Sequence, residues 1–412
     1  MIRRARWAIA TVFFVNGLVI ASWVPHIPAI KGRHALGDGE LGLVLLAMAA
    51  GSVLSLPAAG WLVGRLGSRA MTTTAGVALC LVLPLPVLSG SVSLLSLSLA
   101  LLGASNGVLD VSMNAHALSV ERLYRHAIMS SFHAFFSLGG AVGAALAGVA
   151  MWLGIGNTAH VWGAAGVSVV AVIAAARWLL PAGAEADRSA AIFGWPTRAV
   201  LFLGLLAFAG LLAEGAMADW SAVYLHDSLA ASPAVAATGF AAFSLAMTVG
   251  RLAGDRIVGR LGAGPALRAS GAVAGAGLGA ALLINAPPAA IVGFALVGLG
   301  ISNIIPVLFS SAGRVGEVAA GSALAAVATP GYLGFLSGPP LIGLAAEHVS
   351  LRAALGIVCA ACALVAWAPG GFQPSRRSAA VAALFRVSRR RLRFRESREA
   401  DRSSQRWRRS PC

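Results

Sequence analysis

Long apolar segments alternate with short polar or basic stretches along most of the chain. Six such segments precede a polar stretch at about residues 181–198, and six follow it. Each is close to the ~20 residues that an α-helix needs to cross a hydrocarbon core. The pattern predicts twelve transmembrane helices, near residues 7–30, 41–64, 70–89, 93–119, 128–151, 158–180, 199–224, 233–258, 265–285, 289–312, 318–345 and 351–369.

Composition supports the membrane class. The 412 residues are 58% hydrophobic and 11% charged, with a mean hydropathy of +0.82, whereas soluble domains carry roughly 25% charged residues. A net charge of +16 is typical of a nucleic-acid binder, but so few charges cannot cover a water-soluble surface. We therefore predict an all-α, multi-pass protein of the bacterial inner membrane. We expect it to lie in the lipid bilayer and not to bind nucleic acid.

Basic residues between the segments predict the orientation. Outside the C-terminal tail, fifteen basic residues, Arg251 among them, fall on the side of the N-terminus. The opposite side receives three, namely Lys31, Arg33 and Arg352. Cytoplasmic loops carry the excess of Lys and Arg. We expect both termini in the cytoplasm, which agrees with an even number of helices.

Short motifs recur between the two sets of six segments. The string GRLG at 64–67 returns at 259–262, and three glycines of the fifth segment, Gly139, Gly143 and Gly148, return in the eleventh. Both shifts are 195 residues, which indicates two homologous halves. The predicted division is an N-terminal half (1–180), a cytoplasmic linker (181–198), a C-terminal half (199–370) and a tail (371–412).

The tail is the most basic part of the chain. Residues 376–412 hold thirteen arginines and three acidic residues. We expect a disordered cytoplasmic tail. A basic amphipathic segment lying on the anionic inner leaflet is the alternative.

The loop between the second and third segments reads GWLVGRLGSR (60–69). It resembles the G-x-L-x-D-R-x-G-x-R/K signature of the major facilitator superfamily, with Gly64 in place of the acid. Strings in segments four, seven and eleven are similar to a permease branch loosely related to fucose-type sugar transporters. The resemblance implies the twelve-helix fold of that superfamily, built from two six-helix repeats that alternate access.

The resemblance also implies which residues close the cytoplasmic side. It assigns this gating role to Gly60, Arg65, Gly67 and Arg69, and to Asp255 with Arg256 in the corresponding loop of the second half. The alternative is that these arginines only reflect the positive-inside bias. Asp219, near the outer end of segment seven, is expected to act as a further gating residue.

Acidic residues inside apolar helices are candidates for transport because an ionised carboxylate is costly there. Asp110 and Glu214 are predicted to couple transport to protons. Asn106, Asp110 and Asn114 are spaced i, i+4 and i+8 on one helix face, so they and Glu214 are predicted to bind substrate. A polar clamp between helices is the alternative for the amides.

Two further polar residues complete the prediction. His133 in segment five could relay protons because imidazole titrates near neutral pH, or it could be a hydrogen-bonded residue inside the bundle. Asn303 is predicted to line the substrate cavity. His26, between two prolines at the outer mouth, is expected to be interfacial.

The resulting hypothesis is a monomeric, proton-coupled secondary transporter of a small polar solute, for example a sugar. Proton-driven efflux of an amphipathic compound is one alternative. A receptor or scaffold that transports nothing is another, although it would gain nothing from intramembrane acids. The sequence contains no catalytic or metal-binding motif, so we expect no enzymatic activity, metal or cofactor.

Overall fold

The apolar segments fold as helices, and no strand occurs among the described residues. The computed structural model describes residues 2–124, 126, 128–181, 198–312 and 320–368. The linker predicted at 181–198 lies outside these residues except at its two ends, and the tail predicted at 371–412 lies wholly outside them.

Each predicted segment of the N-terminal half corresponds to one continuous or broken helix. The first is broken at Val24–His26, where Pro25 and Pro28 each lack a backbone donor. The third is broken at Pro84. In order, the elements are α1 (Ile2–Trp23), η1 (Val24–His26), α2 (Ile27–Arg33), α3 (Asp38–Leu66), α4 (Ser68–Val82), α5 (Pro84–Leu88), α6 (Val92–Tyr124), α7 (Met129–Trp152) and α8 (Asn157–Ala176).

The C-terminal half follows the same order. Its first helix ends in a π-helical turn, and its fourth is interrupted at Ser302 and Asn303. The elements are α9 (Arg198–Val223), η2 (Tyr224–Ser228), α10 (Pro233–Leu261), α11 (Ala263–Ile284), α12 (Pro287–Ile301), α13 (Ile304–Ala312), α14 (Ala320–His348), α15 (Leu351–Ala354) and α16 (Gly356–Ala366). Ten described segments are long and apolar enough to cross a membrane; α14 and α15–α16 are additional apolar helices.

Equivalent glycines build the two halves in the same way. Gly139 of α7 packs against the carbonyl of Phe14 on α1, and Gly334 of α14 packs against the carbonyl of Phe208 on α9. A side chain at either glycine would collide with that carbonyl. The fifth helix of each half therefore packs on its first helix through the same close approach, as the repeat predicted.

The turns that follow the second helix of each half also match. Gly67 has φ 83° and ψ 153°, and Gly262 has φ 82° and ψ 162°. This region is accessible essentially to glycine alone. The recurring GRLG string is thus explained by a shared backbone conformation between α3 and α4 and between α10 and α11.

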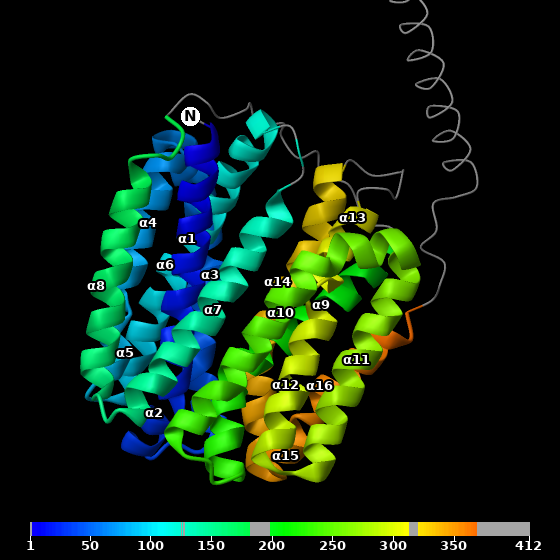
Figure 1. Cartoon of the computed structure of the whole chain (residues 1–412). Coiled ribbons are helices and arrows are strands. Elements are labelled where there is room, and N and C mark those ends of the chain that lie inside the picture. The colour runs from blue at the N-terminus through cyan, green and yellow to red at the C-terminus, as the bar shows by residue number, and fades with distance from the viewer. Residues whose placement is uncertain (1, 125, 127, 182–197, 313–319, 369–412) are drawn as a thin grey trace, which may run out of the picture. The chain divides into compact units, whose positions relative to one another are not determined.

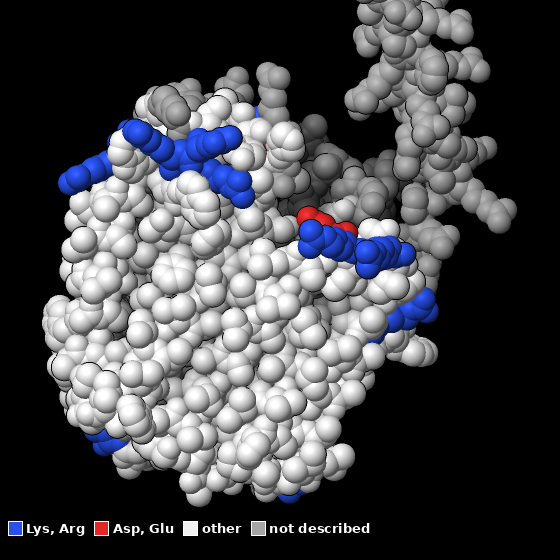
Figure 2. Space-filling model, in the orientation of Figure 1, with Lys and Arg blue, Asp and Glu red and all other residues white. Residues whose placement is uncertain are grey.

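The bundle has two distinct ends. We call the end that carries the N-terminus the basic end; Arg4, Arg65 and Arg260 lie in its helix termini. We call the other the sealed end; Lys31, Asp38 and Asp227 lie there. Figure 2 shows Lys and Arg gathered at the basic end, a few at the opposite end, and a broad uncharged belt between them. An uncharged belt is the surface expected to face lipid.

Candidate functional site

One arginine joins the two halves in the middle of the bundle. Arg251 of α10 forms an ion pair with Glu214 of α9 (Nη2–Oε1 3.4 Å). Its Nη1 donates to the Ser137 hydroxyl (2.5 Å) and to the His133 carbonyl (3.2 Å), both on α7. The side chains of Arg251 and Glu214 are 13% and 24% exposed. We call these four residues the central cluster.

The position of Arg251 corrects the charge count made on the sequence. That count placed it in a cytoplasmic loop, but it lies ten residues before the end of α10, or roughly 15 Å along a helix at 1.5 Å per residue. A buried arginine needs a paired or hydrogen-bonded environment. The ion pair to Glu214 and the two acceptors on α7 provide it.

His133 contributes to the central cluster through its backbone. Its carbonyl accepts from Arg251, while its half-buried ring lies edge-on to Phe13 with centroids 5.5 Å apart. The proton relay suggested for the imidazole stays a prediction. Ser137, which supplies the shortest contact to Arg251 in the cluster, was missed because serines are frequent in this chain.

The polar stripe on α6 forms a second group. Asn114 Nδ2 donates to Asp110 Oδ1 (3.0 Å) and to the Asp110 carbonyl (2.9 Å). Asn106 Oδ1 is buried and has no hydrogen-bond partner in the described part of the chain. All three side chains are half-buried.

Asp219 and Asn303 have different surroundings. Asp219 is half-buried and makes no hydrogen bond or ion pair with any residue that the structure describes. Asn303 Nδ2 donates to the Gly250 carbonyl (3.0 Å) and to the Ser302 hydroxyl (2.9 Å). These contacts are those of a helix-packing residue on α10. The substrate contact predicted for Asn303 therefore stays a prediction.

The residues that the loop signature assigned to gating do not contact the other half in the described structure. Arg65 lies over the Trp61 ring (5.0 Å), and Arg69 donates to the Ala176 carbonyl of α8 (3.1 Å). A side chain at Gly60 would meet no atom within 4 Å. Asp255 and Arg256 are exposed. The latch at the basic end thus stays a prediction for a state in which that end closes.

The sealed end carries an ion-pair network that the sequence did not reveal. Lys31 of α2 pairs with Asp38 of α3 (2.6 Å) and with Asp227 of η2 in the other half (2.7 Å). Lys31 is the only lysine in the chain, which is the one sequence signal that could have singled it out. The network links the two halves directly.

Close helix packing accompanies this network. A side chain at Gly42 of α3 would lie 2.6 Å from the Pro339 carbonyl and 3.2 Å from Gly343, both on α14. A side chain at Gly148 of α7 would lie 3.1 Å from the Ala237 methyl of α10. Small residues let helix backbones approach closely in this way. The two halves therefore pack closely against each other at the sealed end.

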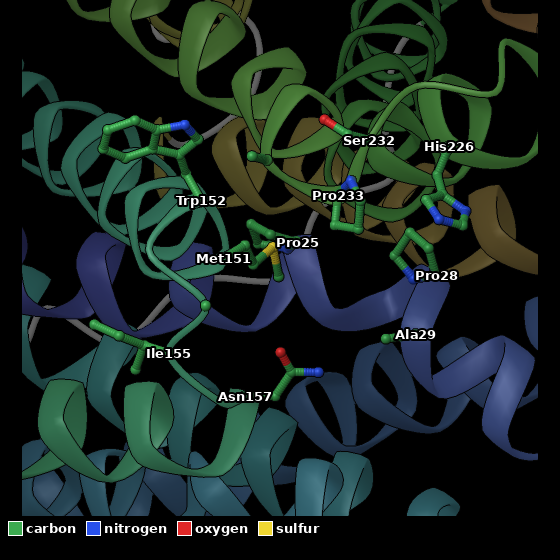
Figure 3. Close-up of a pocket in the computed structure, with 12 residues that line it drawn as sticks. Pro25, Pro28, Ala29, Met151, Trp152, Ile155, Asn157, His226, Ser232 and Pro233 are labelled. Carbon is green, nitrogen blue, oxygen red and sulfur yellow. The ribbon is translucent and has the colours of Figure 1, made fainter.

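A pocket of about 420 Å³ lies beside these contacts. Pro25 and Met151 of the N-terminal half and His226 and Pro233 of the C-terminal half line it (Figure 3). It does not reach Asp110 or the central cluster. Nearby, His26 is 1% exposed and its ring lies 3.0 Å from that of His160; its position at the membrane interface stays a prediction.

Comparisons with known proteins agree on a class. Residues 9–312 match the Major Facilitator Superfamily. An uncharacterised MFS-type transporter of Yersinia pestis is 41% identical over 84% of this chain and 90% of its own length. The membrane protein MosC of Rhizobium meliloti is 35% identical over 90% of each chain. The crystal structure of the nucleoside transporter NupG superposes with a TM-score of 0.68 at 12% identity, covering 88% of this chain and 98% of that one.

Proposed function

The chain belongs to the Major Facilitator Superfamily and is a membrane transporter rather than an enzyme, and we propose that it moves a small polar solute together with protons. The observation that carries the proposal is the central cluster. It places an ion pair in the middle of the bundle, between Glu214 and an arginine that also bridges the two halves. Intramembrane ion pairs of this kind are typical of proton relays and substrate pathways.

We infer twelve crossings, with α14 and α15–α16 completing the ten segments that are long enough. We also infer that the basic end faces the cytoplasm of a bacterial inner membrane, because basic residues gather there. In this orientation the described state is closed to the outside at Lys31, Asp38 and Asp227.

Proton coupling follows from the contacts between α7 and Arg251 that must break when the sealed end opens. Separation of α7 from α10 removes Ser137 and the His133 carbonyl from Arg251. Arg251 is then free to change its distance from Glu214. We propose that Glu214 takes up a proton while the sealed end is open and releases it when the Glu214–Arg251 pair re-forms. The proton would thereby travel with the solute.

The α6 stripe supplies the solute contacts in this proposal. The Asp110 carboxylate accepts hydrogen bonds, and Asn106 and Asn114 can both donate and accept. The unpartnered Asn106 oxygen favours a ligand with hydroxyl or N–H donors. Sugars, other polyols and nucleosides fit this chemistry. Nucleosides are included because the superposed transporter carries them.

The test is solute-dependent proton flux into liposomes that contain the purified protein and a pH-sensitive dye. Sugars, polyols, nucleosides and efflux dyes are screened under an imposed pH gradient. With an active solute, Glu214→Gln is expected to abolish gradient-driven accumulation while solute exchange persists. Asp110→Asn is expected to lower the affinity for the solute. Accumulation by Glu214→Gln at the wild-type level would refute the coupling role.

Glu40→Gln is the matched control. Glu40 caps the exposed Gly37 amide at the start of α3, and glutamine can make the same capping bond. Wild-type flux is expected for this variant. Flux with dyes alone would favour efflux of amphipathic compounds, and the absence of flux with any solute would favour a receptor or scaffold.

A further inference from the structure

A second pocket lies on the N-terminal half at the basic end, outside the central cluster. It has a volume of about 470 Å³ and is formed mainly by α4 and α8. Its lining includes Arg69, Thr73, Thr74, Ile173 and Arg177. We propose that this groove, which we call the α4–α8 groove, binds the headgroup and upper acyl chains of an anionic phospholipid.

The chemistry of the groove changes along its length as that of a phospholipid does. Arg69 is the second residue of α4, and Arg177 directly follows the end of α8, so both lie at the terminal level of the bundle. Thr73 and Thr74 lie about one turn further in on α4. Ile173 lies about one turn further in on α8 and is 48% exposed. Charged side chains therefore lie at the end of the groove, at the level of a phosphate, and hydroxyl and apolar side chains lie together about one turn deeper.

Both arginines retain donors for a phosphate. The Arg69 guanidinium makes one hydrogen bond within the described chain, from Nη2 to the Ala176 carbonyl (3.1 Å). The Arg177 side chain is exposed and makes no hydrogen bond or ion pair to a described residue. A guanidinium presents five N–H donors in a fork that matches phosphate oxygens. Two such groups beside one groove form a site for a phosphate diester.

Trp178, the residue next to Arg177, indicates how deep in the membrane the groove lies. Trp178 is 50% exposed, and the Arg4 guanidinium lies 4.4 Å from the centre of its ring. Tryptophan is enriched at the headgroup level of membranes. Basic pockets between transmembrane helices at this level bind anionic headgroups. The groove thus combines positive charge, interfacial depth and an apolar floor, which a soluble anion would not need.

The proposal is independent of the transported solute, because it needs only the membrane environment. The test is titration of the detergent-purified full chain with dioleoylphosphatidylglycerol, with bound lipid counted by native mass spectrometry. Dioleoylphosphatidylcholine is the uncharged comparison. The double variant Arg69→Gln/Arg177→Gln is expected to bind phosphatidylglycerol about thirtyfold more weakly, because each basic side chain near a membrane surface contributes about fivefold.

Two further variants make the result specific. Arg177→Gln alone removes an exposed side chain with no partner in the described part of the chain, and it is expected to weaken binding about fivefold without changing the unfolding temperature. Arg260→Gln/Arg268→Gln removes two exposed arginines from the basic end of the other half and is expected to leave binding unchanged.

Three results of the lipid titrations would overturn the proposal. These are equal binding by Arg69→Gln/Arg177→Gln and the wild type, equal binding of the two lipids, and an equal loss in the Arg260→Gln/Arg268→Gln control. Glycerol 1-phosphate in large excess is expected not to displace the lipid, because it lacks acyl chains. Displacement by it would identify a soluble-anion site instead and would also contradict the proposal.

Discussion

The sealed end and the basic end differ in what joins the two halves. At the sealed end, Lys31 pairs with Asp227 across the interface, and Gly42 packs directly on α14. At the basic end, Arg65 and Arg69 contact only their own half. The helices α7 and α10 lie side by side where the two halves meet (Figure 1). Among the described residues, the contacts that join the halves therefore lie at the sealed end and in the central cluster.

The comparison also separates two kinds of gating residue. Those predicted from the loop signature lie at the basic end, and their latch stays a prediction. The residues that join the two halves in the structure lie at the sealed end. Closure of the sealed end can be measured as the labelling rate of Asn114→Cys, in a background without native cysteines, by an impermeant maleimide added from the sealed-end side.

The largest effect is expected for Gly42→Val. Its side chain would collide with the Pro339 carbonyl of α14, and overpacking of this kind costs about 1–3 kcal/mol. The labelling rate should rise by about tenfold or more, because the sealed end can no longer close. Gly163→Val is the control, since a side chain at Gly163 meets nothing within 4 Å. A wild-type rate for Gly42→Val would show that α3 and α14 do not form the seal.

Ser137→Ala should have the next largest effect. It removes the 2.5 Å contact to Arg251 between α7 and α10, and a hydrogen bond to a charged group contributes about 1.5–3 kcal/mol. Because the His133 carbonyl still accepts from Arg251, we expect the labelling rate to rise by no more than about tenfold. Ser131→Ala, on the same helix but bonded to the nearby Ile128 carbonyl, should behave as wild type. Equal rates for both variants would place the Arg251 bridge outside the seal.

Lys31→Gln should have a smaller effect. Partly exposed ion pairs contribute about 0.2–1 kcal/mol each, and only the pair with Asp227 crosses the interface. The labelling rate should rise about two- to fivefold, and the difference from wild type should shrink at high salt. Arg352→Gln is the control, because Arg352 donates to carbonyls of its own half. An unchanged rate at low salt would remove Lys31 from the gate.

The smallest effect on the described state is expected for Gly60→Val. A side chain at Gly60 meets no atom within 4 Å, so the unfolding free energy should change by less than about 0.5 kcal/mol. If Gly60 packs when the basic end closes, the same variant should slow labelling from the sealed-end side. Faster labelling would contradict its assignment to the basic end.

Local patterns predicted the helices well because crossing a hydrocarbon core constrains length and composition. Every predicted segment corresponds to a helix or a broken helix, and the repeat correctly paired Gly139 with Gly334. Motif spacing could not reveal contacts between the halves. The pair of Lys31 with Asp227 and the hydrogen bond from Arg251 to Ser137 join residues 196 and 114 positions apart, and only the packed structure brings them together.

One error shows the same limit. Arg251 was counted with the loop residues because the positive-inside count treats each arginine as solvated, whereas Glu214 and α7 provide its partners inside the bundle. The tertiary partners decide its position.

The most direct test of alternation between the two ends is a disulfide across the seal. Gly148→Cys and Ala237→Cys join α7 to α10 where a side chain at 148 lies 3.1 Å from the Ala237 methyl, slightly less than the ~3.5–4.5 Å between the Cβ atoms of a disulfide. Asn114→Cys is then labelled in the same cysteine-free background. We expect oxidised protein to be labelled only from the basic end, and reduction to restore labelling from the other side. Labelling of the oxidised protein from the sealed-end side would contradict a seal between α7 and α10.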